Sequence, residues 1–126
     1  IQLGIIVPAA IVGVWLFSVQ HRFERSAWAR QDDWNFDDAA LKGSSYLRLT
    51  PVLRWLTGNI GLHHLHHLNP RIPNYALQEC QNTVAGMIAT RTIGFFDALR
   101  ATRLALWDEA NARMITFAAA RRSMAA

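Results

Sequence analysis

The sequence predicts an all-α protein in which one membrane-spanning helix is followed by a cytoplasmic helical part. Residues 1–20, IQLGIIVPAAIVGVWLFSVQ, contain no charged side chain. Further along the chain, apolar residues recur at steps of three and four positions, which is the period of an amphipathic helix. No long alternation of apolar and polar residues indicates a β-strand.

Residues 1–20 are long enough to cross a lipid bilayer. At about 1.5 Å per residue, a helix of this length just spans a hydrocarbon layer of about 30 Å. The sequence starts at Ile1 and lacks the basic start and small-residue cleavage site of a secretory signal peptide. We therefore expect a transmembrane helix truncated at its N-terminal side, in which lipid tolerates Pro8 and Gly13. The alternative is a buried core helix of a soluble protein.

Residues 21–126 form the predicted cytoplasmic part. Arg22, Arg25 and Arg30 directly follow the span, and basic residues favour the cytoplasmic side of a membrane. The net charge of +4 is spread along the chain, with one basic pair at 121–122. This distribution favours contact with anionic membrane lipids and predicts no nucleic-acid partner.

Within this part we expect three further helical segments. Residues 46–68 form a short helix or re-entrant piece, interrupted by Pro51 and Gly58, and then the histidine segment. After a turn, Asn74 caps a helix from about 75 to 90, where Cys80 is a small core residue. The last helix, about 95 to 121, is amphipathic and docks on the protein or on the membrane surface. Its apolar stripe is formed by Leu104, Trp107, Ala110, Met114 and Phe117.

Four of the five histidines of the chain fall within five positions, in GLHHLHHLNPRIPNY: His63, His64, His66 and His67. On a helix, His66 and His67 lie about −60° and +40° from His63, so three imidazoles share one arc of about 100°. Leu65 and Leu68 point to the opposite face. The segment thus has a predicted ligand face and a predicted packing face.

Neutral imidazole is the most common metal-ligating side chain and suits iron, zinc, copper and nickel. No glutamate lies between or beside these histidines, so the His-Glu-x-x-His pattern of zinc hydrolases does not match. Three histidines can still form a catalytic zinc site with one open position. Titrating surface histidines and an adventitious metal-binding patch are the remaining interpretations.

The stretch GNIGLHHLHHLNPRIPNY resembles the third histidine box, His-x-x-His-His, of membrane fatty acid desaturases, particularly the bacterial acyl-lipid Δ12 (ω-6) type. VQHRFERSAW is similar to the Gln-His-x-Phe-Glu stretch that follows their last membrane span. LWDEANARMITF resembles their C-terminal helix.

This resemblance implies a partial desaturase fold and an enzyme of lipid metabolism that forms a double bond. It implies two iron ions as a non-haem di-iron centre, dioxygen as co-substrate, a fatty acyl lipid or acyl thioester as substrate, and a ferredoxin or cytochrome as electron donor. The implied iron ligands are His63, His66, His67 and His21; an interfacial His21 paired with Glu24 is the alternative. Residues expected to hydrogen-bond these ligands are His64 and Asn59, with Asn69 and Asn74 as further candidates or as ordinary turn residues.

The family's first two histidine boxes lie upstream of the third, and no histidine precedes His21. We therefore expect the C-terminal part of a desaturase of the bacterial inner membrane, inactive alone, with its histidine box on the cytoplasmic side. A related membrane di-iron hydroxylase is the alternative within redox chemistry, although NPRIPNY favours a desaturase. A non-catalytic membrane metal-binding module is the alternative of another class.

Overall fold

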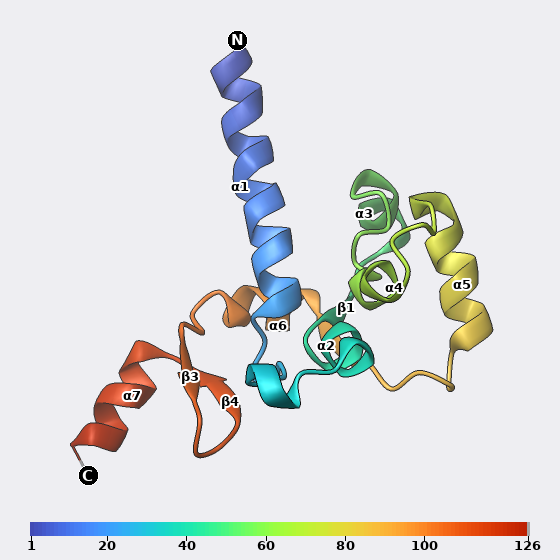
Figure 1. Ribbon diagram of the computed structural model, residues 1–126. Helices are drawn as coiled ribbons and strands as arrows, with labels where there is room; N and C mark the ends of the chain where they lie inside the picture. The colour runs from blue at the N-terminus through green and yellow to red at the C-terminus, as the bar shows by residue number, and fades with distance from the viewer. Residues whose placement is uncertain (126) are drawn as a thin grey trace.

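The computed structural model describes residues 1–125, which form mostly helices with two small sheets. The first helix, α1, runs from Gln2 to His21 and continues through Pro8 without a break. Its N-terminal part projects away from the other elements, as Figure 1 shows, whereas its C-terminal end contacts β1 and α6. Apart from Gln2, its exposed residues are apolar: Leu3 and Ile11 are 75% and 64% exposed, and the first fully buried residue is Val19.

Within the described residues, α1 is the one helix long and apolar enough to cross a membrane by length and composition. Its most apolar 18-residue window has a mean hydropathy of 2.0, and 6% of that window is buried. A core helix of a soluble protein would bury one face, so the exposure of α1 fits the predicted span better than the alternative.

The remaining elements are short. They are a 3-10 turn at Gln31–Asp33, α2 (Phe36–Lys42), β1 (Ser45–Arg48), α3 (Pro51–Leu56), α4 (His63–Leu68), a 3-10 turn at Asn74–Ala76, α5 (Leu77–Val84), β2 (Arg91–Gly94), α6 (Phe95–Ala101), β3 (Leu106–Asp108), β4 (Arg113–Ile115) and α7 (Phe117–Met124). Local caps explain three helix starts, because the side chains of Asn35, Thr50 and Thr116 accept backbone N–H groups of α2, α3 and α7. Pro51 therefore begins a helix and does not interrupt one.

A two-stranded parallel sheet contacts both the C-terminal end of α1 and helix α6. Strands β1 and β2 pair with Leu47 opposite Ile93, and α3, α4 and α5 lie in the connection between them. Leu47 and Ile93 are buried with Val19 and Phe23 of the α1 end and Ala98 of α6. This core fixes the end of α1 against β1.

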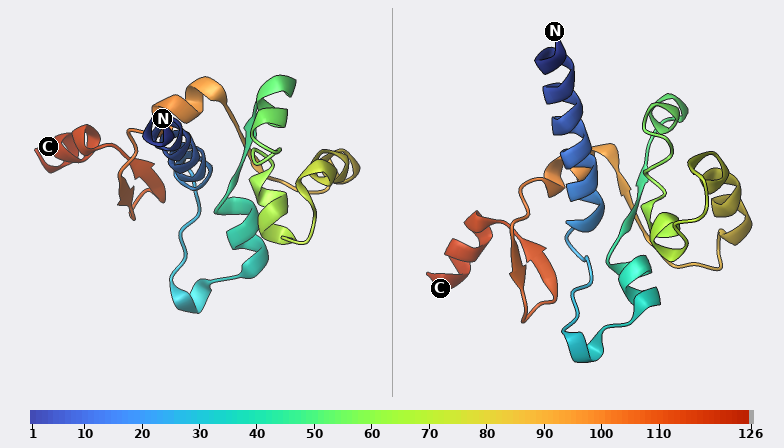
Figure 2. Two further views of the ribbon diagram at one scale, coloured as in Figure 1. Left: turned by 90° about the horizontal axis from the view of Figure 1, so that it is seen from above. Right: turned by 45° about the horizontal axis from the view of Figure 1, so that its top comes forward.

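A second apolar cluster holds α4. Leu62, Leu65 and Leu77 are buried there, and Leu68 and the half-buried Cys80 pack against them. The leucine face of the histidine helix is thus the packing face, as the helical spacing predicts. Figure 2 shows α4 and α5 side by side in both views.

The predicted helix over 75–90 is wrong in its boundaries. Helix α5 starts at Leu77, after the 3-10 turn, and Asn74 provides no side-chain cap. The backbone carbonyl of Asn74 instead accepts a hydrogen bond from Asn59, over 2.9 Å. The helix ends at Val84 because Gly86 adopts a left-handed φ of +86°, which a continuing helix does not allow.

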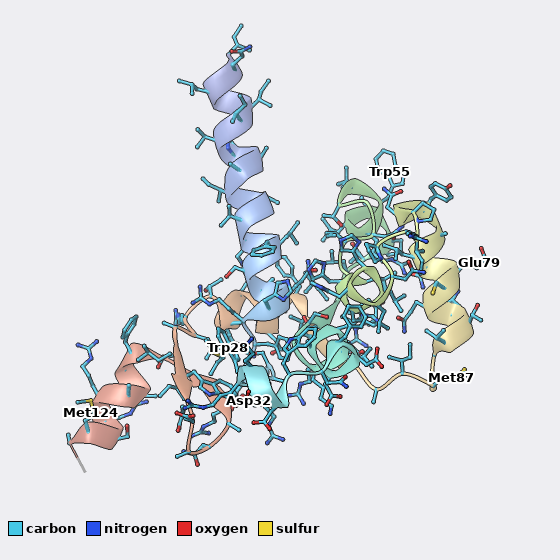
Figure 3. The ribbon with its side chains drawn as sticks, in the orientation of Figure 1. Trp28, Asp32, Trp55, Glu79, Met87 and Met124 are labelled. Carbon is cyan, nitrogen blue, oxygen red and sulfur yellow. The ribbon has the colours of Figure 1, made fainter. Side chains whose placement is uncertain are left out.

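The predicted helix over 95–121 is also wrong, and all-α describes the fold only approximately. Helix α6 ends at Ala101, and an antiparallel hairpin of β3 and β4 precedes α7. The Met114 N–H donates to the Glu24 carbonyl over 2.7 Å, and the Trp107 ring lies 6.4 Å from that of Trp28, labelled in Figure 3. Contacts with residues far away in sequence therefore override the three- and four-residue spacing.

Candidate metal centre

Backbone contacts place the histidine helix beside the end of α1. The Leu47 N–H of β1 donates to the Gly61 carbonyl over 2.8 Å, and Tyr46 forms an isolated antiparallel bridge with Leu62. A Cβ at Gly61 would overlap the Leu47 carbonyl oxygen, so only glycine lets the two segments approach this closely. Helix α4 starts two residues later, at His63.

Three imidazoles meet at this junction. The Nε2 atom of His63 lies 2.9 Å from that of His21 and 3.1 Å from that of His67, and the third edge, His67 to His21, is 3.3 Å. His21 is the last residue of α1, whereas His63 and His67 lie one turn apart on α4. The predicted ligands His21, His63 and His67 therefore form one compact group.

A backbone hydrogen bond selects the tautomer of His21. Its Nδ1 lies 3.2 Å from the Gly43 carbonyl oxygen, which can only accept, so Nδ1 carries the proton. In the neutral ring, Nε2 then presents a lone pair toward His63 and His67. This is the arrangement by which proteins orient a metal-ligating histidine. The interfacial pairing with Glu24 is not formed, because Glu24 lies against Arg113, 4.0 Å away.

The surroundings favour the neutral form of His63 and His67. Burial, and then the charges of the neighbouring histidines, lower the pKa of His63 from 6.5 to about 3. Burial followed by the charges of His21 and His66 also lowers the pKa of His67. Neutral imidazole is the form that binds a metal ion, so these shifts favour binding at pH 7.

The geometry of the three Nε2 atoms fits a metal ion. Two nitrogens that each lie about 2.1 Å from one ion are about 3.0 Å apart at a right angle and about 3.4 Å apart at a tetrahedral angle. The edges of 2.9 to 3.3 Å fall in this range. Three imidazole nitrogens from two helices are also a donor set that iron, zinc and other transition metals accept, so the group suits a metal cation.

His66 is not part of this group. Its ring stacks on that of His63 at a centroid distance of 5.7 Å and lies 6.1 Å from that of His67. The predicted arc of three α4 histidines is thus divided, with His63 and His67 facing His21 and His66 lying beside them.

His64 is turned away from the group and is only 1% exposed. Its Nε2–H donates to the Oε1 atom of Gln81 on α5 over 2.9 Å. Burial lowers its pKa despite this hydrogen bond. No sequence pattern pointed to Gln81 or to the Gly43 carbonyl, because both act through contacts between segments distant in sequence.

The asparagines form loop contacts. Asn59, at a φ of +58°, donates its side-chain N–H to the carbonyl of Asn74 and so joins the loops on either side of α4. The side chain of Asn69 accepts the backbone N–H of Arg71 over 3.1 Å. The Asn69 bond supports its interpretation as a turn residue, and the Asn59 bond connects the loops that flank the histidine helix.

Comparison with known proteins gives a family match and one curated relative. The family model described as Fatty acid desaturase matches residues 1–98, which include all five histidines. A protein of Bacillus subtilis (strain 168) named Fatty acid desaturase is 40% identical over 119 residues, which cover 94% of this chain and 34% of the relative. The chain thus spans about a third of that protein's length. No solved structure matches it. Because this family model matches more than half of the chain, the chain belongs to the fatty acid desaturase family.

Proposed function

We propose that these residues are the C-terminal part of a membrane-bound desaturase that introduces a double bond into a fatty acyl chain, using dioxygen and a histidine-ligated di-iron centre, in lipid metabolism. The observation that carries this proposal is the convergence of the Nε2 atoms of His21, His63 and His67 at the end of an apolar helix. Family membership supports the reaction class.

In this proposal His21, His63 and His67 hold one iron, and His66 belongs to the second. The separation of His66 from the group of three supports this division. Two irons need more than four ligands, so the others come from parts of the longer protein outside these residues, and the 126 residues alone are inactive. Bound iron would supply the redox chemistry with dioxygen, for which neutral nitrogen ligands are suited.

The overall reaction removes two hydrogen atoms from adjacent methylene groups. Dioxygen takes up four electrons, two from the two broken C–H bonds and two from an external donor such as a ferredoxin or a cytochrome. With the two hydrogens of the acyl chain and two protons from solvent, it yields two water molecules. In this reaction the residues of this chain would orient the metal ligands and keep water away from the acyl chain.

An apolar cavity beside the histidine group is suited to the acyl chain of a lipid or thioester. It has a volume of about 370 Å³ and is lined by Leu16, Phe17, Thr57 and His63, among others. A second apolar cavity of about 390 Å³ shares Leu16 and Thr57 with it and extends along α1 toward Phe95. The two cavities thus share part of their lining along α1, and the first of them reaches His63.

We further propose that α1 spans the bacterial inner membrane as residues 1–20 and that residues 21–126 lie in the cytoplasm. Arg22, Arg25 and Arg30 after the apolar helix support this orientation. Trp55 on α3 is 79% exposed and points outward in Figure 3, which suits a tryptophan at the cytoplasmic surface of the membrane.

Metal analysis of the complete protein tests the proposal. After anaerobic purification we expect about two irons per chain, and unsaturated fatty acids in cells that express the protein. His21→Ala, His63→Ala, His66→Ala and His67→Ala should each abolish the product, whereas His64→Ala should lower it by about 10- to 100-fold, because His64 does not face the three Nε2 atoms. Stoichiometric zinc, with activity restored by zinc alone, would overturn the proposal.

A further inference from the structure

The hydrogen bond between His64 and Gln81 connects two helices that otherwise meet through apolar contacts. Within residues 1–125, it is the one side-chain hydrogen bond between α4 and α5. Because an amide oxygen only accepts, the proton lies on Nε2 of His64, and the bond has a defined direction. The buried Leu65 and Leu77 pack beside it without directional preference.

The rotation of α4 about its axis decides where its histidine nitrogens lie. A ring nitrogen is about 6 Å from the axis of a helix, so a rotation of 10° moves it by about 1 Å. Metal–ligand distances tolerate only about 0.2 Å. Helix α4 has six residues, and the apolar contacts that hold it have no preferred direction, so they oppose a small rotation less than a hydrogen bond does. A directional contact on a neighbouring side chain adds this constraint.

We propose that Gln81 is a positioning residue for the metal centre. By holding His64 it fixes the rotation of α4, and with it the directions of His63 and His67 toward His21. This inference rests on the proposed iron site, because it assigns Gln81 a role in that site. Gln81 is half-buried, and within residues 1–125 its side chain forms no hydrogen bond with His21, His63 or His67. It therefore acts through His64.

The test compares three substitutions in the complete protein. Gln81→Leu removes the acceptor, Gln81→Glu keeps an acceptor at the same reach, and Gln81→Asn withdraws it by one methylene group. Gln78→Leu is the matched control, because Gln78 lies one turn earlier on α5 and its side chain bonds to Arg54 and Asn82 and not to α4.

Two readouts separate positioning from mere support of the fold. One is the iron affinity of the apoprotein, by titration with ferrous iron. The other is the absorption spectrum of the cobalt(II)-loaded protein, whose visible bands respond to ligand geometry. We expect Gln81→Leu to weaken iron binding by about 10- to 100-fold and to change the cobalt spectrum, and Gln81→Glu to restore both to within a few-fold of the parent. Gln78→Leu should leave the spectrum unchanged.

A double-mutant cycle tests the route through His64. In a His64→Phe background, Gln81→Leu should cause no further loss of iron affinity, since the contact is already gone. If Gln81→Leu fails to accumulate, Gln81→Asn serves as the test variant. We expect it to change the cobalt(II) spectrum in the same way and to weaken iron binding less than Gln81→Leu would.

The inference is overturned if the folded Gln81 variants keep the parent's cobalt spectrum and iron affinity, even where thermal stability falls. It is also overturned if Gln81→Leu weakens iron binding equally with and without His64. A parent protein that binds neither iron nor cobalt(II) would instead contradict the proposed function, so the two failures are distinguishable.

Discussion

The Nδ1–H of His21 donates a hydrogen bond to the carbonyl oxygen of Gly43, 3.2 Å away. This bond joins the last residue of the apolar helix to the residue that ends α2. It leaves the Nε2 lone pair of His21 facing His63 and His67. Partners of this kind set both the tautomer and the ring orientation of a ligand, and their loss typically weakens metal binding by about 10- to 100-fold.

Gly43→Ala should disturb this bond. A Cβ at Gly43 would lie 2.5 Å from the Ala39 carbonyl oxygen, so the backbone must shift and carry the Gly43 carbonyl with it. We expect iron affinity to fall by about 10-fold or more, measured by titration of the complete apoprotein. Gly94→Ala is the control, because its Cβ would make only an ordinary contact of 3.5 Å with Asp97. Equal iron affinity in the two variants would contradict the role of the Gly43 carbonyl.

His66→Ala and His67→Ala should each lose one of the two irons, whereas the double substitution should lose both. His66 stands apart from the group of three, so its loss should leave one iron per chain, held by His21, His63 and His67. His67→Ala should remove the other iron, and the double variant should lose both. Iron analysis of anaerobically purified protein measures this. Loss of both irons in His66→Ala would show that the four histidines act as one indivisible site.

Leu16→Phe should change the acyl chains that the complete enzyme uses. Leu16 lines both apolar cavities along α1, so a larger ring there takes up space in each. We expect the product profile to shift toward shorter acyl chains while iron content stays the same, as measured by gas chromatography of cellular fatty acids. Val14→Phe is the control, because Val14 is 69% exposed and lines neither cavity. An unchanged profile in Leu16→Phe would mean that the acyl chain lies elsewhere.

Val7→Arg should release the 126-residue chain from membranes. Val7 lies in the first half of the apolar helix, and an arginine at the centre of such a helix costs about 3 kcal/mol of insertion free energy, with a smaller cost nearer the end. We expect the share of chain that sediments with membranes to fall after a carbonate wash. Ala29→Arg, an exposed position outside α1, should have no such effect. Retention of Val7→Arg equal to that of Ala29→Arg would contradict a spanning α1.

The sequence by itself determined the features that depend on local order along the chain. An uncharged stretch of twenty residues is enough to define α1, since helix length and hydrophobicity are local properties. The spacing of His63, His67 and Leu65 likewise defines a ligand face and a packing face once the segment is helical, as α4 is. Caps such as Thr50 act within one turn and can be read in the same way.

Only the tertiary structure decided which histidines meet. Spacing alone put His66 on the same face of α4 as His63 and His67. Because α1 is held against β1, His21 comes into contact with His63 and His67, and His66 stays outside this group. The partners Gly43 and Gln81 could not be predicted for the same reason, because the carbonyl of one and the amide of the other reach the histidines across 22 and 17 residues of chain.

The C-terminal region shows the limit of periodicity most clearly. Residues 95–121 carry a helical spacing of apolar residues, yet a hairpin forms where Met114 bonds to Glu24 and Trp107 packs near Trp28. The difference in intrinsic propensity between helix and strand is a few tenths of a kcal/mol per residue, which non-local packing and hydrogen bonding exceed. Sequence thus determined where this protein is apolar and where its histidines cluster, and tertiary contacts determined which elements form around them.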